Sequence, residues 1–211
     1  MIWFLMINDT FYNSLSIDLL ETTAAKTFGE YPYSDFEQFI KLIKSSDSVL
    51  EVGCATGRIG IELIKYGVSY TGIETQQRFI DIFKERNNSN SDIVRGTLKI
   101  LNISFMDLLP DKKYNVVLFP WSVMGDFSKE NQKIVLGKTY NFLLPGGVCI
   151  IDNPSKNQIP NKAELYNPCL FYYEDWKEIF TNLGFKHEAI LYRTKTEVER
   201  ELITLHIPAL N

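Results

Sequence analysis

Three glycines lie between an apolar run and an amphipathic segment at residues 49–60, which read VLEVGCATGRIG. Their spacing, Gly53, Gly57 and Gly60, is neither the dinucleotide fingerprint Gly-x-Gly-x-x-Gly nor the phosphate loop, which requires Gly-Lys-Ser/Thr. Glycine still allows a sharp turn and the close approach of a ligand, and the first turn of a following helix offers free N–H groups. The segment predicts a strand, a ligand-binding turn and a helix in succession.

Strand-like and helix-like segments alternate along most of the chain. Helices are expected at residues 35–45, 58–66, 76–86, 128–143 and 174–183, and strands at 48–52, 68–73, 100–105, 114–119, 148–152, 185–192 and 199–207. A capping box, Ser34-Asp35-Phe36-Glu37, predicts where the first helix begins. The alternation predicts a doubly wound α/β fold whose mainly parallel sheet has helices on both faces. Ligands of such sheets bind at the carboxyl ends of the strands.

Acidic side chains stand at three of these expected strand ends. Glu51 precedes the glycine turn by two residues, so it would repel a pyrophosphate and suits an ammonium group. Glu74 ends the second expected strand, where a carboxylate can accept both hydrogen bonds of a ribose diol. Asp107 can accept from an exocyclic amine, and the apolar Met106 and Leu108 can sandwich a flat ring. A cationic amino acid end, a ribose and an adenine without phosphate describe S-adenosylmethionine.

The sequence resembles the class I S-adenosylmethionine-dependent methyltransferases over residues 36–205. The matching motifs are VLEVGCATG at 49–57, YTGIE at 70–74, FMD at 105–107, YNVVL at 114–118, LLPGGV at 143–148 and YYEDWKEIFTNLGF at 172–185. The resemblance implies a Rossmann-like sheet of seven strands in the order 3-2-1-4-5-7-6, with strand seven antiparallel. Ala55 and Asn115 stand where the family often has glycine and aspartate.

The residues expected to bind the cofactor are Glu51, Gly53, Cys54, Ala55, Gly57, Arg58, Glu74, Thr75, Met106, Asp107, Phe119 and Trp121. Structural alternatives stay open for several of them. Glu51 could pair with Arg58 or Lys65, Glu74 could be a solvated residue at a helix start, and Asp107 could cap a turn. Trp121 could wall the cofactor or simply cover the core.

The methyl acceptor is expected to meet residues 119–126, because this segment follows the fourth strand and should border the transferred methyl group. Asp126 could orient the acceptor or cap the helix near Ser128. Residues 153–173 are long and rich in Asn, Pro and Tyr, which is typical of a substrate lid, and residues 10–32 could form the opposite wall. The acceptor-binding residues expected are Tyr12, Tyr31, Asp126, Asn153 and Tyr172. No general base is evident, and His187 and His206 are interpreted as sheet residues.

The amino-acid composition limits the kinds of partner that are expected. The net charge of −4 lacks the basic footprint of a nucleic-acid-binding protein, and the three cysteines fit neither a disulfide framework nor a zinc site. No metal is expected, and no apolar run approaches a membrane span. The terminal MIWFLMI lacks the features of a signal peptide, so a cytoplasmic protein is expected. Its oligomeric state is not indicated.

One methyltransferase domain over residues 1–211 is expected, with a helical cap at 1–46, a cofactor-binding core at 47–152, the lid at 153–173 and a final helix and strands at 174–211. The favoured function is methyl transfer from S-adenosylmethionine to an oxygen or nitrogen of a small molecule, carried chiefly by positioning. The alternatives are a methyltransferase for RNA or protein and a non-catalytic domain that binds S-adenosylmethionine. A dinucleotide oxidoreductase is disfavoured by Glu51.

Overall fold

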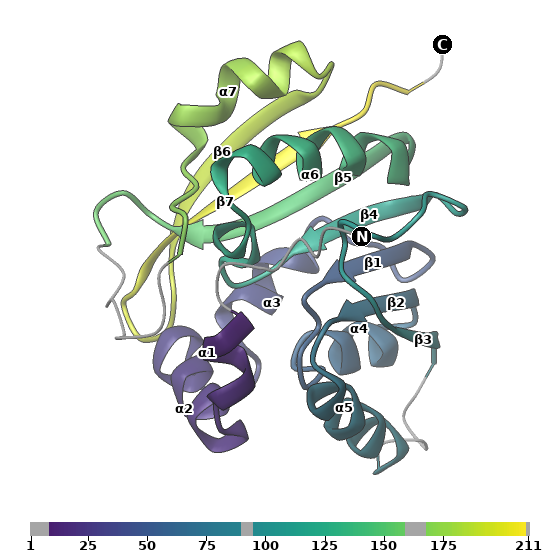
Figure 1. Cartoon of the computed structure of the whole chain (residues 1–211), viewed down its shortest axis with the longest axis vertical. Helices are drawn as coiled ribbons and strands as arrows, with labels where there is room; N and C mark the ends of the chain where they lie inside the picture. Colours follow the sequence, from purple (N-terminus) through teal and green to yellow (C-terminus); the bar gives the residue numbers. More distant parts are fainter. Residues whose placement is uncertain (1–8, 90–94, 159–167, 210–211) are drawn as a thin grey trace.

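A single sheet of seven strands organises the computed structural model, which describes residues 9–89, 95–158 and 168–209. The strands are β1 (Ser48–Val52), β2 (Ser69–Glu74), β3 (Thr97–Asn102), β4 (Tyr114–Phe119), β5 (Leu143–Pro154), β6 (Lys186–Arg193) and β7 (Glu199–His206). Their order is β3-β2-β1-β4-β5-β7-β6, and β7 runs antiparallel to both of its neighbours (Figure 1). The predicted fold class and strand order are confirmed.

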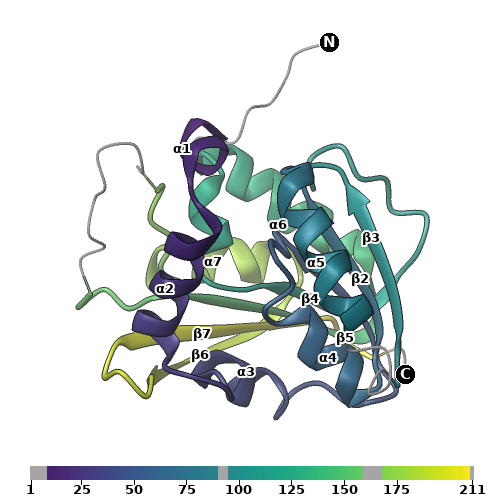
Figure 2. The same cartoon turned by 90° about the horizontal axis from the view of Figure 1, so that it is seen from below.

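Helices cover both faces of the sheet (Figure 2). One face packs against α6 (Lys129–Phe142) and α7 (Tyr173–Asn182), and the other against α3 (Ser34–Phe39), α4 (Gly60–Tyr66) and α5 (Gln77–Ser89). Within the described ranges, no helix has the length and apolar character needed to cross a membrane.

The central strands are apolar on both sides. Along β4, Val117 and Phe119 join the core under α6 and α7, whereas Val116 and Leu118 join the core under α3 and α4. Successive side chains of a strand point to opposite faces, so a strand covered on both faces needs a continuous apolar run. This is why the segment at 114–119 predicts a strand with the observed bounds.

The third strand lies three residues earlier than the sequence predicts, at Thr97–Asn102 instead of 100–105. It is an edge strand that pairs only with β2, from Ser69↔Thr97 to Glu74↔Asn102, and all of its residues are exposed or half-buried. The apolar Phe105 that suggested a strand is instead buried from the turn that follows. Its ring packs against Phe119 and Phe142, with centroids 5.5 and 5.3 Å apart.

The predicted capping box is wrong. Tyr33 occupies the N-cap position of α3, but its side chain makes no capping hydrogen bond. Ser34 lies inside the helix. The Ser34 hydroxyl donates to the carbonyl of Phe28 (2.7 Å) and accepts from the backbone N–H of Lys195 (2.8 Å). A residue that resembles a local cap therefore ties α3 to the N-terminal helices and to the turn between β6 and β7.

Two further helices, α1 (Asp9–Ser14) and α2 (Ile17–Phe28), lie beside the carboxyl ends of the parallel strands (Figures 1 and 2). Leu15 and Leu20 pack against Phe79 of α5, and Ala55 and Trp121 border the same cluster. The N-terminal segment thus closes over the edge of the sheet where a ligand is expected.

Candidate active site

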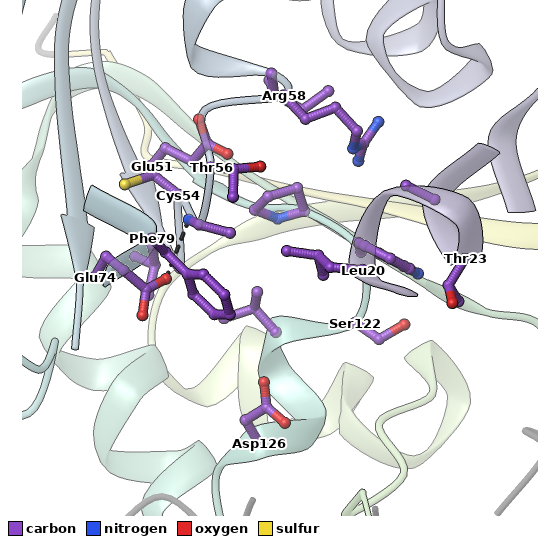
Figure 3. A pocket seen from close by; sticks show the side chains of 18 of the residues that line it. Leu20, Thr23, Glu51, Cys54, Thr56, Arg58, Glu74, Phe79, Ser122 and Asp126 are labelled. Carbon is purple, nitrogen blue, oxygen red and sulfur yellow. Dashed lines mark hydrogen bonds between the residues drawn. The ribbon is translucent and has the colours of Figure 1, made fainter. Parts of the chain in front are cut away.

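A cavity of about 1080 Å³ opens at the carboxyl edge of the sheet (Figure 3). Its walls come from the turn after β1, the end of β2, the segment after β4, helices α1 and α2, and residues that flank the end of β5 and the start of α7. It lies where ligands bind in open α/β sheets.

The turn after β1 is shaped by its glycines, although not mainly for a ligand. Gly53 and Gly57 adopt φ values of +71° and +84°, which favour glycine. A Cβ atom on Gly57 would lie 2.4 Å from the ring of Phe83, and one on Gly60 would lie 2.6 Å from the rings of Phe83 and Tyr70. Two of the three glycines therefore let the turn pack closely against α5 and β2.

Substitution of Gly57 with alanine is expected to lower the free energy of unfolding by about 2–4 kcal/mol, since it combines a left-handed backbone with an overpacked contact. Gly137→Ala is the matched control, because its Cβ atom would lie inside helix α6 with nothing nearer than 3.9 Å. That control should stabilise the protein by about 0.5–1 kcal/mol. Urea unfolding of both variants measures the difference, and equal stabilities would contradict the packing role.

Glu51 is buried at the bottom of the cavity, with 2% of its surface exposed. The hydroxyl of Tyr70 donates to its carboxylate at 2.6 Å. Burial raises the pKa of Glu51 to about 8, although the Tyr70 hydrogen bond and the charge of Arg58 oppose the shift. Direct pairing of Glu51 with Arg58 or Lys65, the alternative suggested by the sequence, is wrong, since these cations bond to other acids.

Glu74 is held by backbone donors on both of its oxygens. The N–H groups of Thr75 (2.8 Å) and Gln76 (2.9 Å) donate to Oε1, and that of Ala55 (3.0 Å) donates to Oε2. Burial raises the pKa of Glu74, and these hydrogen bonds counteract the shift. The carboxylate is therefore fixed between the turn after β1 and the start of α5, on the cavity wall.

Arg58 joins the glycine turn to α3. Its guanidinium donates two hydrogen bonds to the buried Asp35, at 2.8 and 2.6 Å. Aromatic rings surround it, with centroids 4.6 to 5.7 Å from its Cζ atom: Phe28, Tyr33 and Trp121. The pKa of Arg58 is raised by the charge and hydrogen bonds of Asp35, which outweigh the opposing effect of burial, so the cation persists on the cavity wall.

The segment after β4 adopts a left-handed backbone at two residues, Trp121 (φ 43°) and Ser122 (φ 67°). Asp152 accepts from the N–H of Trp121 through its side chain (3.1 Å) and from that of Ser122 through its carbonyl (2.7 Å). Arg200 in turn donates to both Asp152 oxygens (3.0 and 2.5 Å) and to the Ser122 hydroxyl (3.1 Å). This buried network holds a strained segment at the edge of the cavity.

Sequence analysis missed Arg200. It lies in the last expected strand, 48 residues from its partner Asp152, and no local spacing connects the two. A signal did exist, because Arg200 shares one face of its strand with the apolar Leu202, and an arginine buried on that face must find an acid.

Asp126 does not cap a helix. Ser128 caps α6 by accepting from the N–H of Asn131 (3.2 Å), so the capping interpretation of Asp126 is wrong. Asp126 ends the short helix η2 (Val123–Asp126), and its carboxylate accepts a hydrogen bond from the hydroxyl of Tyr12 at 3.0 Å. Both residues line the cavity.

Most of the expected site residues meet at this cavity. Those that line it are Glu51, Gly53, Cys54, Ala55, Gly57, Arg58, Glu74, Thr75, Trp121, Tyr12, Tyr31, Asp126 and Asn153. Those that do not are Met106, Asp107, Phe119 and Tyr172. Residues 103–105 line it in place of Met106 and the exposed Asp107. Phe119 is fully buried in the core, and Tyr172 lies against Lys156.

The expected lid is described only in part. Residues 159–167 of the 153–173 segment lie outside the described residues, whereas Asn153, Gln158, Leu170 and Phe171 line the cavity. The ligand roles of all these residues stay predictions.

Comparison with known proteins identifies the family. The model of a family described as a methyltransferase domain matches residues 43–199. The chain belongs to this methyltransferase family. The predicted membership of a methyltransferase family is confirmed, and the strand order is the one predicted for the class I enzymes. A search of curated proteins returned no significant match.

Solved structures share the fold of this methyltransferase. The N-methyltransferase NodS from Bradyrhizobium japonicum WM9, in complex with S-adenosyl-L-homocysteine, is 14% identical with a TM-score of 0.70, over 96% of this chain and 99% of its own. Magnesium protoporphyrin IX methyltransferase from Synechocystis PCC 6803 is 12% identical, with a TM-score of 0.66 over 95% of each chain. The glycopeptide N-methyltransferase MtfA is 15% identical, with a TM-score of 0.67 over 83% and 93%.

Proposed function

We propose that this methyltransferase binds S-adenosylmethionine in the cavity and transfers its methyl group to an oxygen or nitrogen of a small-molecule acceptor. The observation that carries the proposal is the shape of the cavity, in which two acids, the buried Glu51 and the half-buried Glu74, stand at one end and the helices α1 and α2 close the other. The relatives named above include enzymes for both a glycopeptide and a porphyrin, which leaves the acceptor class to be argued from the site.

The donor end of the cavity suits a nucleoside with an ammonium group and no phosphate. Glu74 is fixed by three backbone N–H groups at the end of β2, where its carboxylate can accept from a ribose diol. Glu51 lines the cavity and would bind the ammonium group, and the turn after β1 would hold the carboxylate of the amino acid end. A pyrophosphate in the same place would meet the carboxylates of both Glu51 and Glu74.

The sulfonium supplies a methyl group that is already activated, so the protein has mainly to orient the acceptor. Rigid positioning of two reactants contributes on the order of 7–11 kcal/mol to such a reaction. The strained segment at Trp121 and Ser122, fixed by Asp152, provides a stiff wall beside the expected path of the methyl group. Leu15, Leu20 and Phe79 exclude water at the N-terminal helices.

The size and cover of the cavity favour a metabolite over a macromolecule. A volume of about 1080 Å³ lies just above the range of about 300–1,000 Å³ that is typical of small-molecule sites. Side chains of α1 and α2 form the outer wall, where an RNA or a protein chain would have to enter. The acidic net charge of −4 also offers no general attraction for a phosphate backbone.

Substitution of Glu74 with glutamine is expected to weaken S-adenosylmethionine binding at least about tenfold, because one ribose hydroxyl loses a charged acceptor and the Ala55 N–H loses its partner. Glu85→Gln, an exposed residue of α5, makes the same chemical change away from the cavity and should bind normally. Isothermal titration calorimetry with S-adenosylmethionine and with NAD, run side by side, provides the measurement. Unchanged affinity in Glu74→Gln, or tighter binding of NAD, would refute the donor site.

A further inference from the structure

Asn153 carries a buried amide on the wall of the cavity, near the carboxyl end of β5. The residue is 1% exposed, and its Nδ2 atom has no hydrogen-bond partner among the described residues. Native proteins keep few such groups, because a hydrogen bond that is not made inside the protein destabilises the fold. An amide kept at this position therefore indicates a ligand that supplies the missing partner.

The strand order places Asn153 at the acceptor end of the cavity. Glu51 and Glu74, the acids of the donor end, stand on β1 and β2, whereas β5 is separated from β1 by β4. Ser122, whose N–H donates to the carbonyl of the neighbouring Asp152, lies well apart from both acids in Figure 3. The Asn153 amide therefore lies beside the segment after β4, where the acceptor is expected.

Asn153 and its neighbour Asp152 point to opposite faces of the sheet, because successive side chains of a strand alternate. The Asp152 carboxylate accepts hydrogen bonds from Tyr192 and Arg200 on one face. Ile151, two residues before Asn153, joins the core under α6 and α7 on the other face. The hydrogen bonds of the Arg200 network therefore do not reach the Asn153 amide.

Apolar side chains also line this end of the cavity. Phe127 and Phe171 belong to the core under α6 and α7 and contribute to the cavity wall. Leu19 and Leu170 line the cavity as well, and they are 53% and 45% exposed. Exposed leucines at the opening of a site favour a ligand that covers them, and a hydrogen bond in apolar surroundings is stronger than one in water.

The hydrogen bonds of the nearby guanidiniums favour a neutral oxygen as the partner of Asn153. Arg200, on the strand next to β5, donates to both oxygens of Asp152, and Arg58 donates twice to Asp35. A carboxylate beside Asn153 would lose its hydration and gain a hydrogen bond from a neutral amide, which compensates a buried charge poorly. A carbonyl oxygen needs only the donor that the amide offers.

We propose that the acceptor is an apolar molecule with a neutral carbonyl group, whose oxygen accepts a hydrogen bond from the Asn153 amide. This inference rests on the proposed function and gives its acceptor a chemical class. The last torsion of an asparagine is broad, so the amide can turn its N–H groups toward the ligand. The carbonyl positions the acceptor and is not itself methylated, and the apolar body lies against Leu19, Leu170 and Phe171.

Pairs of probes that differ only in the carbonyl oxygen test the proposal without knowledge of the natural acceptor. Each pair exchanges C=O for C=CH₂ and keeps the planar shape: 4-hydroxyacetophenone with 4-isopropenylphenol, 4-aminoacetophenone with 4-isopropenylaniline, and cyclohexanone with methylenecyclohexane. Their affinities are measured by ligand-observed NMR at saturating S-adenosylhomocysteine. In at least one pair the ketone is expected to bind at least as tightly as its alkene, although the alkene is the more apolar of the two.

Variants assign the binding of the ketone to the amide. Asn153→Leu removes the donor at similar size, so the ratio of ketone to alkene affinity should fall about three- to tenfold, as the loss of one net hydrogen bond requires. Asn153→Ala removes the same donor without added bulk and should lower the ratio similarly. Asn141→Leu makes the same exchange at an exposed residue of α6 and should keep the parent ratio.

Binding of S-adenosylhomocysteine separates this proposal from the one on which it rests. If the parent protein does not bind it, the proposed function itself is wrong. If only the two Asn153 variants fail to bind it, the amide has a structural role and the carbonyl is overturned.

With that binding intact, three results overturn the carbonyl. The first is that every ketone binds more weakly than its alkene, or not at all. The second is a ratio that stays unchanged in both Asn153 variants, which would assign the amide to an internal water only. The third is tighter binding of 4-hydroxybenzoate than of 4-hydroxyacetophenone, which would assign the site to a carboxylate.

Discussion

Replacement of Arg200 with methionine is expected to lower the free energy of unfolding by about 3–5 kcal/mol at pH 7. Arg200 is 3% exposed and Asp152 is fully buried, so the substitution leaves a carboxylate without its counter-charge inside the protein. Burial already raises the pKa of Asp152, and the charge of Arg200 opposes that rise. Without Arg200, the carboxyl group of Asp152 has to take up a proton, or it remains charged and strongly destabilises the folded state. Urea unfolding monitored by circular dichroism measures the loss.

Arg193→Met and a double variant serve as controls. Arg193 lies on the same pair of strands but is 66% exposed, with acids at 3.5 and 3.9 Å, so its substitution should cost less than about 0.5 kcal/mol. The double variant Asp152→Asn/Arg200→Met removes both charges and should be more stable than Arg200→Met alone. If the free energy of unfolding of Arg200→Met lies within about 1 kcal/mol of the parent value, Arg200 and Asp152 do not form a stabilising buried network.

The same network links stability to the site. Trp121 and Ser122 keep a backbone conformation that L-residues rarely adopt, and Asp152 bonds to the N–H groups of both. Such conformations persist only where the surroundings enforce them. The Arg200→Met variant should therefore lose order at residues 120–123, and the cavity wall beside the expected methyl path should become mobile. Hydrogen exchange of the Trp121 and Ser122 amides would report it.

Local patterns in the sequence predict the scaffold of this protein well. Alternating strands and helices give the fold class, and residues 49–60 locate the turn at which the cavity forms. The strand order came from the resemblance to a family, because spacing alone cannot say which strands are neighbours. The edge strand β3 was misplaced because its half-exposed residues carry little apolar signal, whereas Phe105, beyond the strand, carries a strong one.

Contacts between distant segments account for what the sequence did not predict. Tyr12 meets Asp126 across 114 residues, Arg200 meets Asp152 across 48, and Arg58 meets Asp35 across 23. None of these pairs has a helical or strand spacing, so Asp126 seen alone suggested a cap or an acceptor contact, Arg58 suggested a cofactor ligand, and Arg200 suggested no role. Packing of the glycine turn on Phe83 is equally non-local, and it gives Gly57 and Gly60 a structural role that the motif conceals.

The affinity for S-adenosylmethionine should rise with pH between 6 and 7.5 because of Glu51. Burial raises the pKa of Glu51 to about 8, so in the empty cavity the group is mostly protonated at neutral pH. An ammonium ion is held well only by the ionised form, which is roughly 1% of the molecules at pH 6 and roughly a quarter at pH 7.5. Binding then releases a proton, and the affinity should increase about twentyfold over this range. Above about pH 8 the ligand's own amino group loses its proton and the rise ends.

Glu51→Gln distinguishes this titration from other effects of pH. The amide does not ionise, so the affinity of this variant for S-adenosylmethionine should stay nearly constant from pH 6 to 7.5. It should be close to the parent value at pH 6 and well below the parent value at pH 7.5. Without ligand, the stability of the parent protein relative to Glu51→Gln should change with pH in the opposite direction. The folded-state pKa of Glu51 lies above its usual 4.5, so the parent's stability relative to Glu51→Gln is greatest below pH 4.5 and is lost as the pH rises through 8. Calorimetry in buffers of different ionisation enthalpy counts the protons released when S-adenosylmethionine binds. If the parent protein releases none at pH 7, Glu51 does not bind the ammonium group.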